Sequence, residues 1–334
     1  MSQLYDARGN LYAVTTPQAL RERGIAIADN AADAAASRPQ WASTAVQAMC
    51  SWPHDLPPAG AKAHRSDGLL VGPFQDAAPF DLLIVNTDGT LAERSGNGLT
   101  IFAQYLTDIG LARHEAGFEL RVHHDKPGSV TPVTTRAEPM TVEGEAGFWL
   151  TLGKAGFGLD AVGALASAVK PAQLNGRPVH HVPALAALDH AWAHSVFVRI
   201  GNPHCVTLVG DEAQLPSFAH LHAADLNAGL TRIAFAEGEQ GSGQPCPAGV
   251  NLQWAWVMSA DQIIARVFER GEGPTASSGT SASAVACAAW HAGLVPGGLI
   301  KVQMPGGTAP VRLVEADGAL QVSLFGVARS LEML

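Results

Sequence analysis

Two short serine motifs are the parts of this 334-residue chain whose residue types and surroundings could do chemistry. Ser95-Gly96-Asn97 and Ser278-Gly279-Thr280 each follow a strand-like run and open a helix-like run, and the two serines are 183 positions apart. The ordinary role of such a serine is to cap the helix, because its side chain accepts a backbone N–H. The N–H groups left free at a helix N-terminus, together with the positive end of the helix dipole, also attract an anion.

Two such helix N-termini could hold one carboxylate between them, with the side chains of Asn97 and Thr280 as further donors. The α-carboxylate of an amino acid fits this role. When the α-proton is removed, negative charge spreads onto that carboxylate, so donors placed there stabilise the transition state more than the ground state. One group on each face of the α-carbon could then remove a proton and return one. This chemistry needs no cofactor and no metal, and it predicts a small-molecule amino-acid substrate.

Short apolar or alternating runs bounded by Gly, Pro and Asp predict the strands that position these motifs. These runs cover 11–16, 81–87, 117–123, 147–153, 195–201, 205–209, 262–270 and 300–307. Helical patterns cover 28–48, 97–109 and 280–292, and the last two stop at a glycine, as helix C-termini often do. Asp88-Gly89 predicts a hairpin whose return strand is 90–94, and 237–249 has the composition of a loop.

The chain also repeats itself. Gly9-Asn10 recurs as Gly201-Asn202 with an offset of 192, and the spacing from Asn86 to Ser95 recurs from Glu269 to Ser278 with an offset of 183. Features that recur in one order at nearly one offset indicate two homologous halves. We therefore expect an α+β fold with two pseudo-symmetric domains, each a strand-rich sheet or barrel wrapped around a central helix, and an active-site cleft between them. The expected halves are 1–130, which the segment 320–334 could join, and 131–319.

At these motifs the chain resembles diaminopimelate epimerase over nearly its whole length. The matching fragments are Gly9-Asn10, Asn86-Thr87-Asp88-Gly89, Ser95-Gly96-Asn97-Gly98, Gly201-Asn202-Pro203-His204-Cys205-Val206, Val250-Asn251, Glu269-Arg270-Gly271-Glu272-Gly273, Ser278-Gly279-Thr280 and Met304-Pro305-Gly306-Gly307. Each fragment alone is weak, but their common order is specific. The resemblance implies a racemase or epimerase of amino-acid metabolism that acts at an α-carbon without pyridoxal phosphate.

The resemblance also implies roles for individual residues. Ser95 and Ser278 occupy the two catalytic positions. The residues that would contact the substrate are Asn10, Asn86, Gly96, Asn97, Asn202, Asn251, Glu269, Arg270, Gly279 and Thr280. Within this set Glu269 and Arg270 match the pair that binds the amino and carboxylate ends of the substrate. A carboxylate can bind an ammonium group, and a guanidinium can bind a carboxylate. His204 follows Asn202-Pro203 and is an auxiliary candidate base, because the unperturbed pKa of histidine lies near neutrality.

The chain departs from the family pattern at both catalytic positions, where the family has cysteine and this chain has Ser95 and Ser278. A thiol at a helix N-terminus can lose its proton and act as a base, whereas a serine hydroxyl needs an adjacent base. Four explanations remain open. The chain could be a natural variant that uses other groups or water for the chemistry, or the two serines could be substitutions made to trap a complex. It could also be a binding protein that lost the chemistry, or a lyase or tautomerase on the same scaffold. Related proline racemase-like and phenazine-biosynthesis isomerase-like families also vary these positions.

Composition restricts the other classes of function. The net charge is −9 with no basic run, which argues against nucleic-acid binding. There is no signal-peptide pattern and no apolar run long enough for a membrane span, so no membrane partner is expected. The four cysteines are scattered and form no C-x-x-C pair, which favours a reducing cytoplasmic location. The oligomeric state stays open, with a homodimer as one alternative.

Two rival enzyme classes have weaker support in the sequence. His190 and His194 have a spacing that could grip zinc on a helix, but no H-E-x-x-H pattern and no third ligand accompany them, so no metal site is predicted. A serine hydrolase would need a G-x-S-x-G turn, and neither Ser95 nor Ser278 has one.

Overall fold

The computed structural model of this chain describes residues 3–52, 56–58, 62–113, 115–126 and 128–331. It divides into two compact units, residues 1–151 with 326–334 and residues 152–325. The change from one unit to the other thus comes after Thr151 and not at the expected 130/131. The reason is that β6 (Val133–Val142) pairs with β5 (Phe118–Val122), so this hairpin extends the first sheet.

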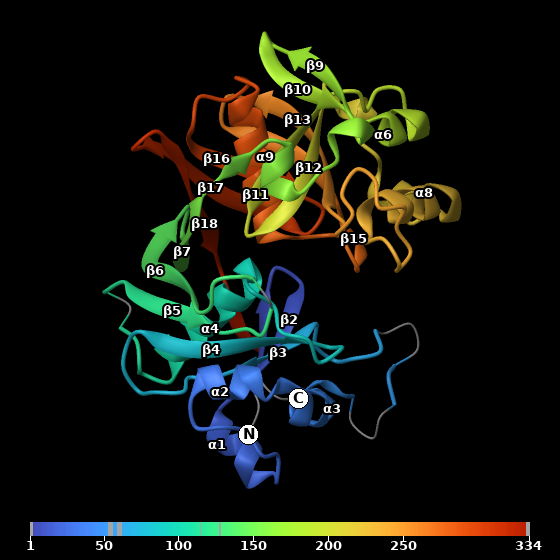
Figure 1. Cartoon of the computed structure of the whole chain (residues 1–334). Helices are drawn as coiled ribbons and strands as arrows, with labels where there is room; N and C mark the ends of the chain where they lie inside the picture. The colour runs from blue at the N-terminus through green and yellow to red at the C-terminus, as the bar shows by residue number, and fades with distance from the viewer. Residues whose placement is uncertain (1–2, 53–55, 59–61, 114, 127, 332–334) are drawn as a thin grey trace. The chain divides into compact units, whose positions relative to one another are not determined.

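The first unit is a mixed sheet whose strands pair in the order β19-β1-β2-β3-β4-β5-β6-β7. Figure 1 labels β2 to β7 of this sheet. Besides β5 and β6, the strands of this sheet are β1 (Gln3–Ala7), β2 (Asn10–Thr15), β3 (Gly68–Val71), β4 (Phe80–Asn86), β7 (Glu145–Lys154) and β19 (Arg329–Leu331). The pairs β2–β3 and β4–β5 are parallel and the others are antiparallel. Residues 326–334, which bring β19 to β1, therefore belong to the first unit.

Helices cover both faces of the first sheet. The helix α4 (Gly96–Asp108) packs on β1 and β2, and α2 (Ala31–Ala36) and α3 (Ala42–Cys50) pack on β3 and β4. A third short helix, α1 (Pro17–Glu22), contributes Leu20 to the core beneath α2 and α3. Alternate strand residues supply the two faces, as the two-residue period of a strand requires.

The predicted single helix over 28–48 is wrong. The chain there forms α2, a 3-10 turn η1 (Arg38–Gln40) and α3. The Ser37 hydroxyl bonds to the carbonyl oxygen of Asp33 at the end of α2. Pro39 lacks an N–H and disfavours helical geometry in the residue before it, so the helix stops there. The buried Trp41 then donates from Nε1 to the carbonyl oxygen of Ala34 over 2.8 Å, which fixes the bend.

The second unit repeats the strand pattern of the first. Antiparallel and parallel pairing alternate along β11, β12, β13, β14, β16 and β17, starting and ending with an antiparallel pair. The pairing alternates in the same order along β1 to β6 of the first unit. The strands of the second unit are β8 (Gly156–Phe157), β9 (Lys170–Leu174), β10 (Arg177–His181), β11 (Ser195–Ile200), β12 (Asn202–Val209), β13 (Asn251–Ser259), β14 (Gln262–Glu269), β15 (Gly273–Thr275), β16 (Gly298–Met304), β17 (Gly307–Ala316) and β18 (Ala319–Gly326). The expectation of two pseudo-symmetric halves is confirmed.

The central helix of the second unit is α9 (Gly279–His291), around which β11, β12, β13, β14, β16 and β17 pack (Figure 1). Every residue from Thr280 to Ala289 is buried, and most are Ala or Ser. A helix buried on all sides needs small side chains so that the strands can close around it. The outer face is covered by α5 (Leu159–Val162), α6 (Pro183–Leu188), α7 (Phe218–Leu221) and α8 (Ala224–Ala234), which pack on Phe197 and Trp254.

The other local predictions have mixed outcomes. All eight predicted strand runs overlap strands of the structure, and the helices predicted at 97–109 and 280–292 are α4 and α9, each shifted by one residue. The segment 237–249 is a loop, as predicted. The return strand at 90–94 is wrong, because only one bridge, Val85 to Leu91, forms there. The Asp88 carboxylate instead accepts the Thr90 N–H and hydroxyl, which ends the ladder.

Candidate functional site

Ser95 caps α4 in the first unit, as its position in the sequence predicts. Its backbone is extended, with φ −140° and ψ 121°, and its hydroxyl oxygen accepts the Gly98 N–H over 3.1 Å. The hydroxyl also lies 3.3 Å from the phenol oxygen of Tyr12. Within the described part of the chain, no carboxylate bonds to Ser95. This serine therefore has a neutral hydroxyl as its neighbour.

Ser278 caps α9 in the second unit with nearly the same geometry. Its φ is −147° and its ψ is 118°, and its hydroxyl oxygen accepts the Ser281 N–H over 3.3 Å. In addition, the Ser278 hydroxyl donates to Oε1 of Glu269 over 2.6 Å. The two caps thus share a backbone conformation and differ in the group beside the hydroxyl.

Glu269 ends β14 and faces two hydroxyl donors. Ser278 donates to one of its oxygens, and the Thr275 hydroxyl lies 3.4 Å from the other. Burial raises the pKa of the Glu269 carboxyl above its ordinary value, and the hydrogen bond from Ser278 offsets part of that rise. A carboxylate with a raised pKa, bonded to a hydroxyl at a helix N-terminus, can accept a proton through that hydroxyl.

Arg270 and Asn251 lie next to this pair. The Arg270 N–H donates to Oδ1 of Asn251 over 2.8 Å, and Nη1 of Arg270 donates to the carbonyl oxygen of Ala248 over 2.7 Å. The side chain of Arg270 passes close to Gly249, where an added Cβ would lie 2.5 Å from Cδ of Arg270. The structure therefore holds Asn251, Glu269, Arg270 and Ser278 together at one end of the second sheet.

Three other candidate asparagines, Asn10, Asn86 and Asn202, each begin or end a strand. Asn10 begins β2 and donates from Nδ2 to the Asp67 carboxylate over 3.0 Å. Asn86 ends β4 at the repeat position of Glu269 and donates from Nδ2 to the Thr90 hydroxyl over 2.9 Å. Asn202 begins β12, the counterpart of β2. The first two bind protein groups in this structure, and Asn202 is partly buried.

The two helix N-termini keep unpaired backbone donors. The first N–H groups of a helix have no intrahelical acceptors, because no helical carbonyl lies four residues before them. In the described residues, no hydrogen bond uses the N–H groups of Gly96, Asn97, Gly279 or Thr280. These four donors are the groups that the sequence assigned to the reacting carboxylate.

His204 does not behave as its ordinary pKa suggests. It has 0% exposure, and burial lowers its pKa to about 3, with the positive charge of Arg270 adding to the effect. Its Nδ1 lies 3.0 Å from Nε2 of Gln253, which also bonds to the Ser281 hydroxyl over 3.1 Å. His204 is therefore neutral at pH 7, and the reasoning from an unperturbed pKa is wrong for this residue.

Tyr12 is a site residue that the sequence reasoning missed. It pairs with Gly68 in the parallel β2–β3 ladder, as His204 pairs with Asn251 in the β12–β13 ladder. An added Cβ on Gly68 would lie 2.6 Å from the Tyr12 ring, so the glycine makes room for the ring that reaches Ser95. The offset of 192 that relates Asn10 to Asn202 also relates Tyr12 to His204, and this signal could have found it.

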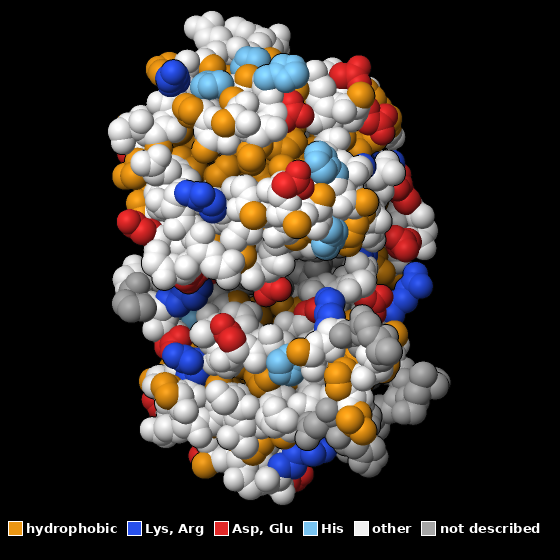
Figure 2. Space-filling view, turned by 90° about the vertical axis from the view of Figure 1, so that its right-hand side faces the viewer, with side chains coloured by type: hydrophobic (Ala, Val, Ile, Leu, Met, Phe, Trp, Pro, Cys, Tyr) orange, Lys and Arg blue, Asp and Glu red, His pale blue; other side chains and the backbone are white. Residues whose placement is uncertain are grey.

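Other kinds of site find no support in the described residues. Among these residues no group of three or more His, Cys, Asp and Glu side chains could hold a metal ion. The four cysteines are free and buried. None of the helices in the described ranges is long and apolar enough to cross a membrane. On the face shown in Figure 2, Lys and Arg side chains are scattered among acidic ones and form no continuous basic patch.

Comparison with known sequences identifies the family. A family profile described as diaminopimelate epimerase matches residues 196–330. The protein named diaminopimelate epimerase 2 of Nostoc sp. is 31% identical over 280 residues, which cover 78% of this chain and 84% of that protein. The diaminopimelate epimerase of Microcystis aeruginosa is 27% identical over 267 residues, with coverages of 79% and 82%.

Comparison with solved structures shows the same fold in two further proteins. A hydroxyproline epimerase from Agrobacterium vitis, solved with trans-4-hydroxy-L-proline, has a TM-score of 0.57 at 13% identity, covering 99% of this chain and 90% of that one. A PhzF-family phenazine biosynthesis protein from Bacillus anthracis has a TM-score of 0.55 at 12% identity, covering 99% and 96%. Because the Nostoc protein is 31% identical over 78% of this chain and the repeated sheet-and-helix units agree with that match, this chain belongs to the diaminopimelate epimerase family.

Proposed function

We propose that this protein is an isomerase that moves the α-proton of an amino acid without pyridoxal phosphate, and that Ser278 and Glu269 form its acid–base pair on one face of the α-carbon. The observation that carries the proposal is the 2.6 Å hydrogen bond from the Ser278 hydroxyl to Glu269. It supplies the adjacent base that a serine needs at a position where the family has cysteine.

Glu269 is suited to accept a proton. Its pKa is raised by burial, so it is a stronger base than an exposed carboxylate. When Glu269 accepts a proton through Ser278, the hydroxyl gives its own proton to the carboxylate and takes the α-proton. The net change is one proton moved from the α-carbon to Glu269, with Ser278 unchanged.

The helix N-termini would take up the charge that this step creates. The unpaired N–H groups of Gly279 and Thr280 sit next to Ser278, and those of Gly96 and Asn97 sit next to Ser95. Backbone donors are fixed in advance and stabilise a developing oxyanion without reorganisation. Glu269 serves as base in this proposal, so the reading of its carboxylate as a simple ammonium ligand is replaced.

The serine of the first unit has a different neighbour. Ser95 has the Tyr12 hydroxyl at 3.3 Å and no bonded carboxylate among the described residues. A pair of neutral hydroxyls donates a proton more readily than it accepts one. We therefore assign Glu269 and Ser278 to proton removal, and Tyr12 and Ser95 to proton delivery. In the delivery step Ser95 gives its proton to the α-carbon and takes the proton of Tyr12, which leaves a tyrosinate that regains a proton from water.

This asymmetry also favours a second candidate function, in which Glu269 both removes and returns the proton. Such a one-face isomerase would exchange the α-proton or shift it within the substrate without inverting the α-carbon. The Ser278–Glu269 bond serves both candidates, and the second is favoured because no carboxylate among the described residues bonds to Ser95.

The test follows the α-proton in heavy water, with the stereoisomers of diaminopimelate as first substrates because the family suggests them. Deuterium incorporation with inversion supports two-face transfer, and incorporation with retention supports one-face transfer. Binding of each substrate, measured by calorimetry, without any exchange would refute both and favour a binding protein.

Variants assign the step to residues. General acid–base groups contribute about 10²–10⁴-fold to a rate, so Glu269→Gln and Ser278→Ala should each slow exchange by at least about 100-fold while binding changes little. Glu239→Gln, an exposed carboxylate in the 237–249 loop, is the matched control and should keep the wild-type rate. An unchanged rate in Glu269→Gln would remove Glu269 from the mechanism.

A further inference from the structure

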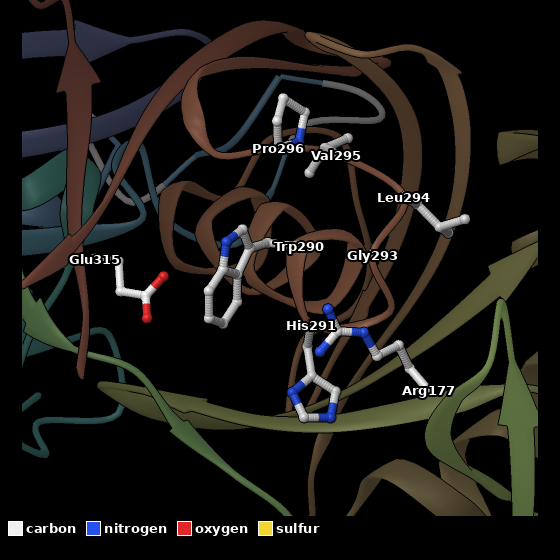
Figure 3. A pocket seen from close by; sticks show the side chains of 8 residues that line it. All are labelled: Arg177, Trp290, His291, Gly293, Leu294, Val295, Pro296 and Glu315. Carbon is white, nitrogen blue, oxygen red and sulfur yellow. The ribbon is translucent and has the colours of Figure 1, made fainter. Parts of the chain in front are cut away.

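A hollow of about 540 Å³ lies at the C-terminal end of α9, within the second unit (Figure 3). The described residues that line it are Arg177, Trp290, His291, Gly293, Leu294, Val295, Pro296 and Glu315. Ser278 caps the other end of the same 13-residue helix, so about 20 Å of helix separates the two places at 1.5 Å per residue. The hollow is therefore distinct from the serine site of this unit.

Two opposite charges face this hollow without partners. Arg177 begins β10 and Glu315 lies near the end of β17, and both side chains are exposed. Within the described residues, neither side chain takes part in a hydrogen bond or an ion pair. In Figure 3 the indole of Trp290 lies between the Glu315 carboxylate on one side and the Arg177 guanidinium on the other.

The ends of the two central helices share a backbone conformation but carry different side chains. In both units the central helix ends at a glycine in the left-handed region, Gly110 with φ 75° and Gly293 with φ 68°, and these are 183 positions apart. At the end of α4 the position of His291 is taken by Asp108, whose carboxylate accepts the Tyr5 hydroxyl over 2.8 Å. The corresponding end of the first unit is thus filled by paired polar groups.

The walls of the hollow are held in place by contacts of their own. The hairpin turn between β9 and β10 reaches the helix end, where Nδ2 of Asn175 donates to the carbonyl oxygen of Gly293 over 3.0 Å. Phe157 stacks on His291 with ring centroids 4.7 Å apart and an 18° interplanar angle. The aromatic wall made by Trp290 and His291, both packed against Phe157, is therefore largely formed before any ligand arrives.

We propose that this hollow binds a small zwitterion whose carboxylate meets Arg177, whose ammonium group meets Glu315, and whose aliphatic chain crosses the indole of Trp290. Its volume lies in the range of small-molecule sites. A guanidinium holds a carboxylate in two parallel hydrogen bonds, and an ammonium group is attracted both by a carboxylate and by an indole face. The position of Trp290 between the charges selects a ligand whose own charges are separated by several methylene groups.

A purely structural role explains only one of these charges. A cation near a helix C-terminus is stabilised by the helix dipole, and this would account for Arg177 beside Gly293. The same dipole disfavours an anion, so Glu315 in the same hollow gains nothing from it. The zwitterion accounts for both.

The probe is 6-aminohexanoate, compared with hexanoate and hexylamine, which each lack one charge. This probe has no α-ammonium group, so it is not a substrate for the proposed isomerase. Binding is measured by calorimetry and by the fluorine NMR signal of Trp290 in 5-fluorotryptophan-labelled protein, assigned with Trp290→Phe. We expect 6-aminohexanoate to bind at least about tenfold more tightly than either analogue, because each charged hydrogen bond contributes on that order.

Variants separate the two charges. Arg177→Gln should bind 6-aminohexanoate no better than hexylamine, and Glu315→Gln should bind it no better than hexanoate. Arg312→Gln, an exposed cation on the same strand as Glu315 but outside the hollow, should keep the wild-type affinity. Ser278→Ala should also keep it, which distinguishes this hollow from the serine site.

Three results would overturn the proposal. The first is equal affinity for 6-aminohexanoate and its singly charged analogues. The second is no shift of the Trp290 signal at tens of millimolar probe. The third is an Arg177→Gln variant that melts at a lower temperature but binds the probe as the wild type does, which would leave Arg177 with the helix-dipole role alone.

Discussion

The Ser278 hydroxyl donates a hydrogen bond to Oε1 of Glu269 over 2.6 Å, while the serine at the repeat position, Ser95, has a tyrosine hydroxyl in place of a carboxylate. The residue at the repeat position of Glu269 is Asn86, which bonds to Thr90. One duplicated backbone therefore carries two different proton-handling groups. Among the described residues, the serine of the second unit thus bonds to a carboxylate and the serine of the first unit lies beside a neutral hydroxyl.

The pH dependence of exchange should report the raised pKa of Glu269. Since the carboxylate is the active form, the exchange rate should rise with pH through a value above the ordinary carboxyl range. Measured rates between pH 4 and 9 check this, and a profile that is flat from pH 4.5 upward would contradict it.

The same shift predicts a change in stability. A folded-state pKa above the unfolded one gives a contribution to stability that is present at low pH and lost as pH rises through the folded value. The free energy of unfolding of Glu269→Gln minus that of the wild type should therefore increase as pH rises. Urea unfolding at several pH values gives this difference, and Glu239→Gln controls for the loss of one acidic side chain elsewhere in the protein.

His204 should make the protein sensitive to acid. Its pKa is lowered to about 3, so the neutral, buried form contributes stability above the ordinary histidine pKa, and this is lost as pH falls toward the folded value. We expect His204→Gln to lose less stability than wild type between pH 6.5 and pH 3. The slope of unfolding free energy against pH is the readout, because it does not depend on any fixed cost of the substitution. Equal slopes would show that His204 does not titrate on unfolding.

Gly68 should control the position of Tyr12. A Cβ at Gly68 would lie 2.6 Å from the Tyr12 ring and 2.9 Å from the carbonyl oxygen of Val85, so Gly68→Ala must displace the ring or the strand. We expect a loss of stability of about 1–3 kcal/mol, as overpacking typically causes, and a loss of inversion with α-proton exchange retained. Tyr12→Phe removes the hydroxyl without the clash and should affect inversion alone. Gly210→Ala, where the nearest atom would be 3.8 Å away, is the control.

Restoring both thiols tests the match between pocket and substrate. Ser95→Cys with Ser278→Cys places thiols at two helix N-termini, where the thiolate is stabilised. If the pocket accepts diaminopimelate, inversion of this substrate should increase by at least about tenfold, within the range that acid–base groups supply. A double variant that still binds diaminopimelate but inverts it no faster would show that the surrounding groups are not arranged for two-thiol chemistry.

Much of the fold follows from short-range signals. The capping serines, the glycines at the helix ends and the strand periodicity act within a few residues, and the predicted α4 and α9 fall within one residue of their true bounds. The helix predicted over 28–48 failed because the Ser37 and Pro39 break and the Trp41 bond to Ala34 outweigh the helical propensity of alanine.

The sequence by itself determined the family, the repeated halves and the identity of the serines, because these depend on order and spacing along the chain. Only the tertiary structure decided which group each serine faces. Glu269 reaches Ser278 because β14, β15 and the start of α9 fold back on one another, and Tyr12 reaches Ser95 across a strand pairing that requires Gly68. Likewise, the pKa of His204 depends on burial by segments far apart in the sequence. Hydrogen bonds and desolvation act over a few ångströms in space, and distance along the chain does not encode them.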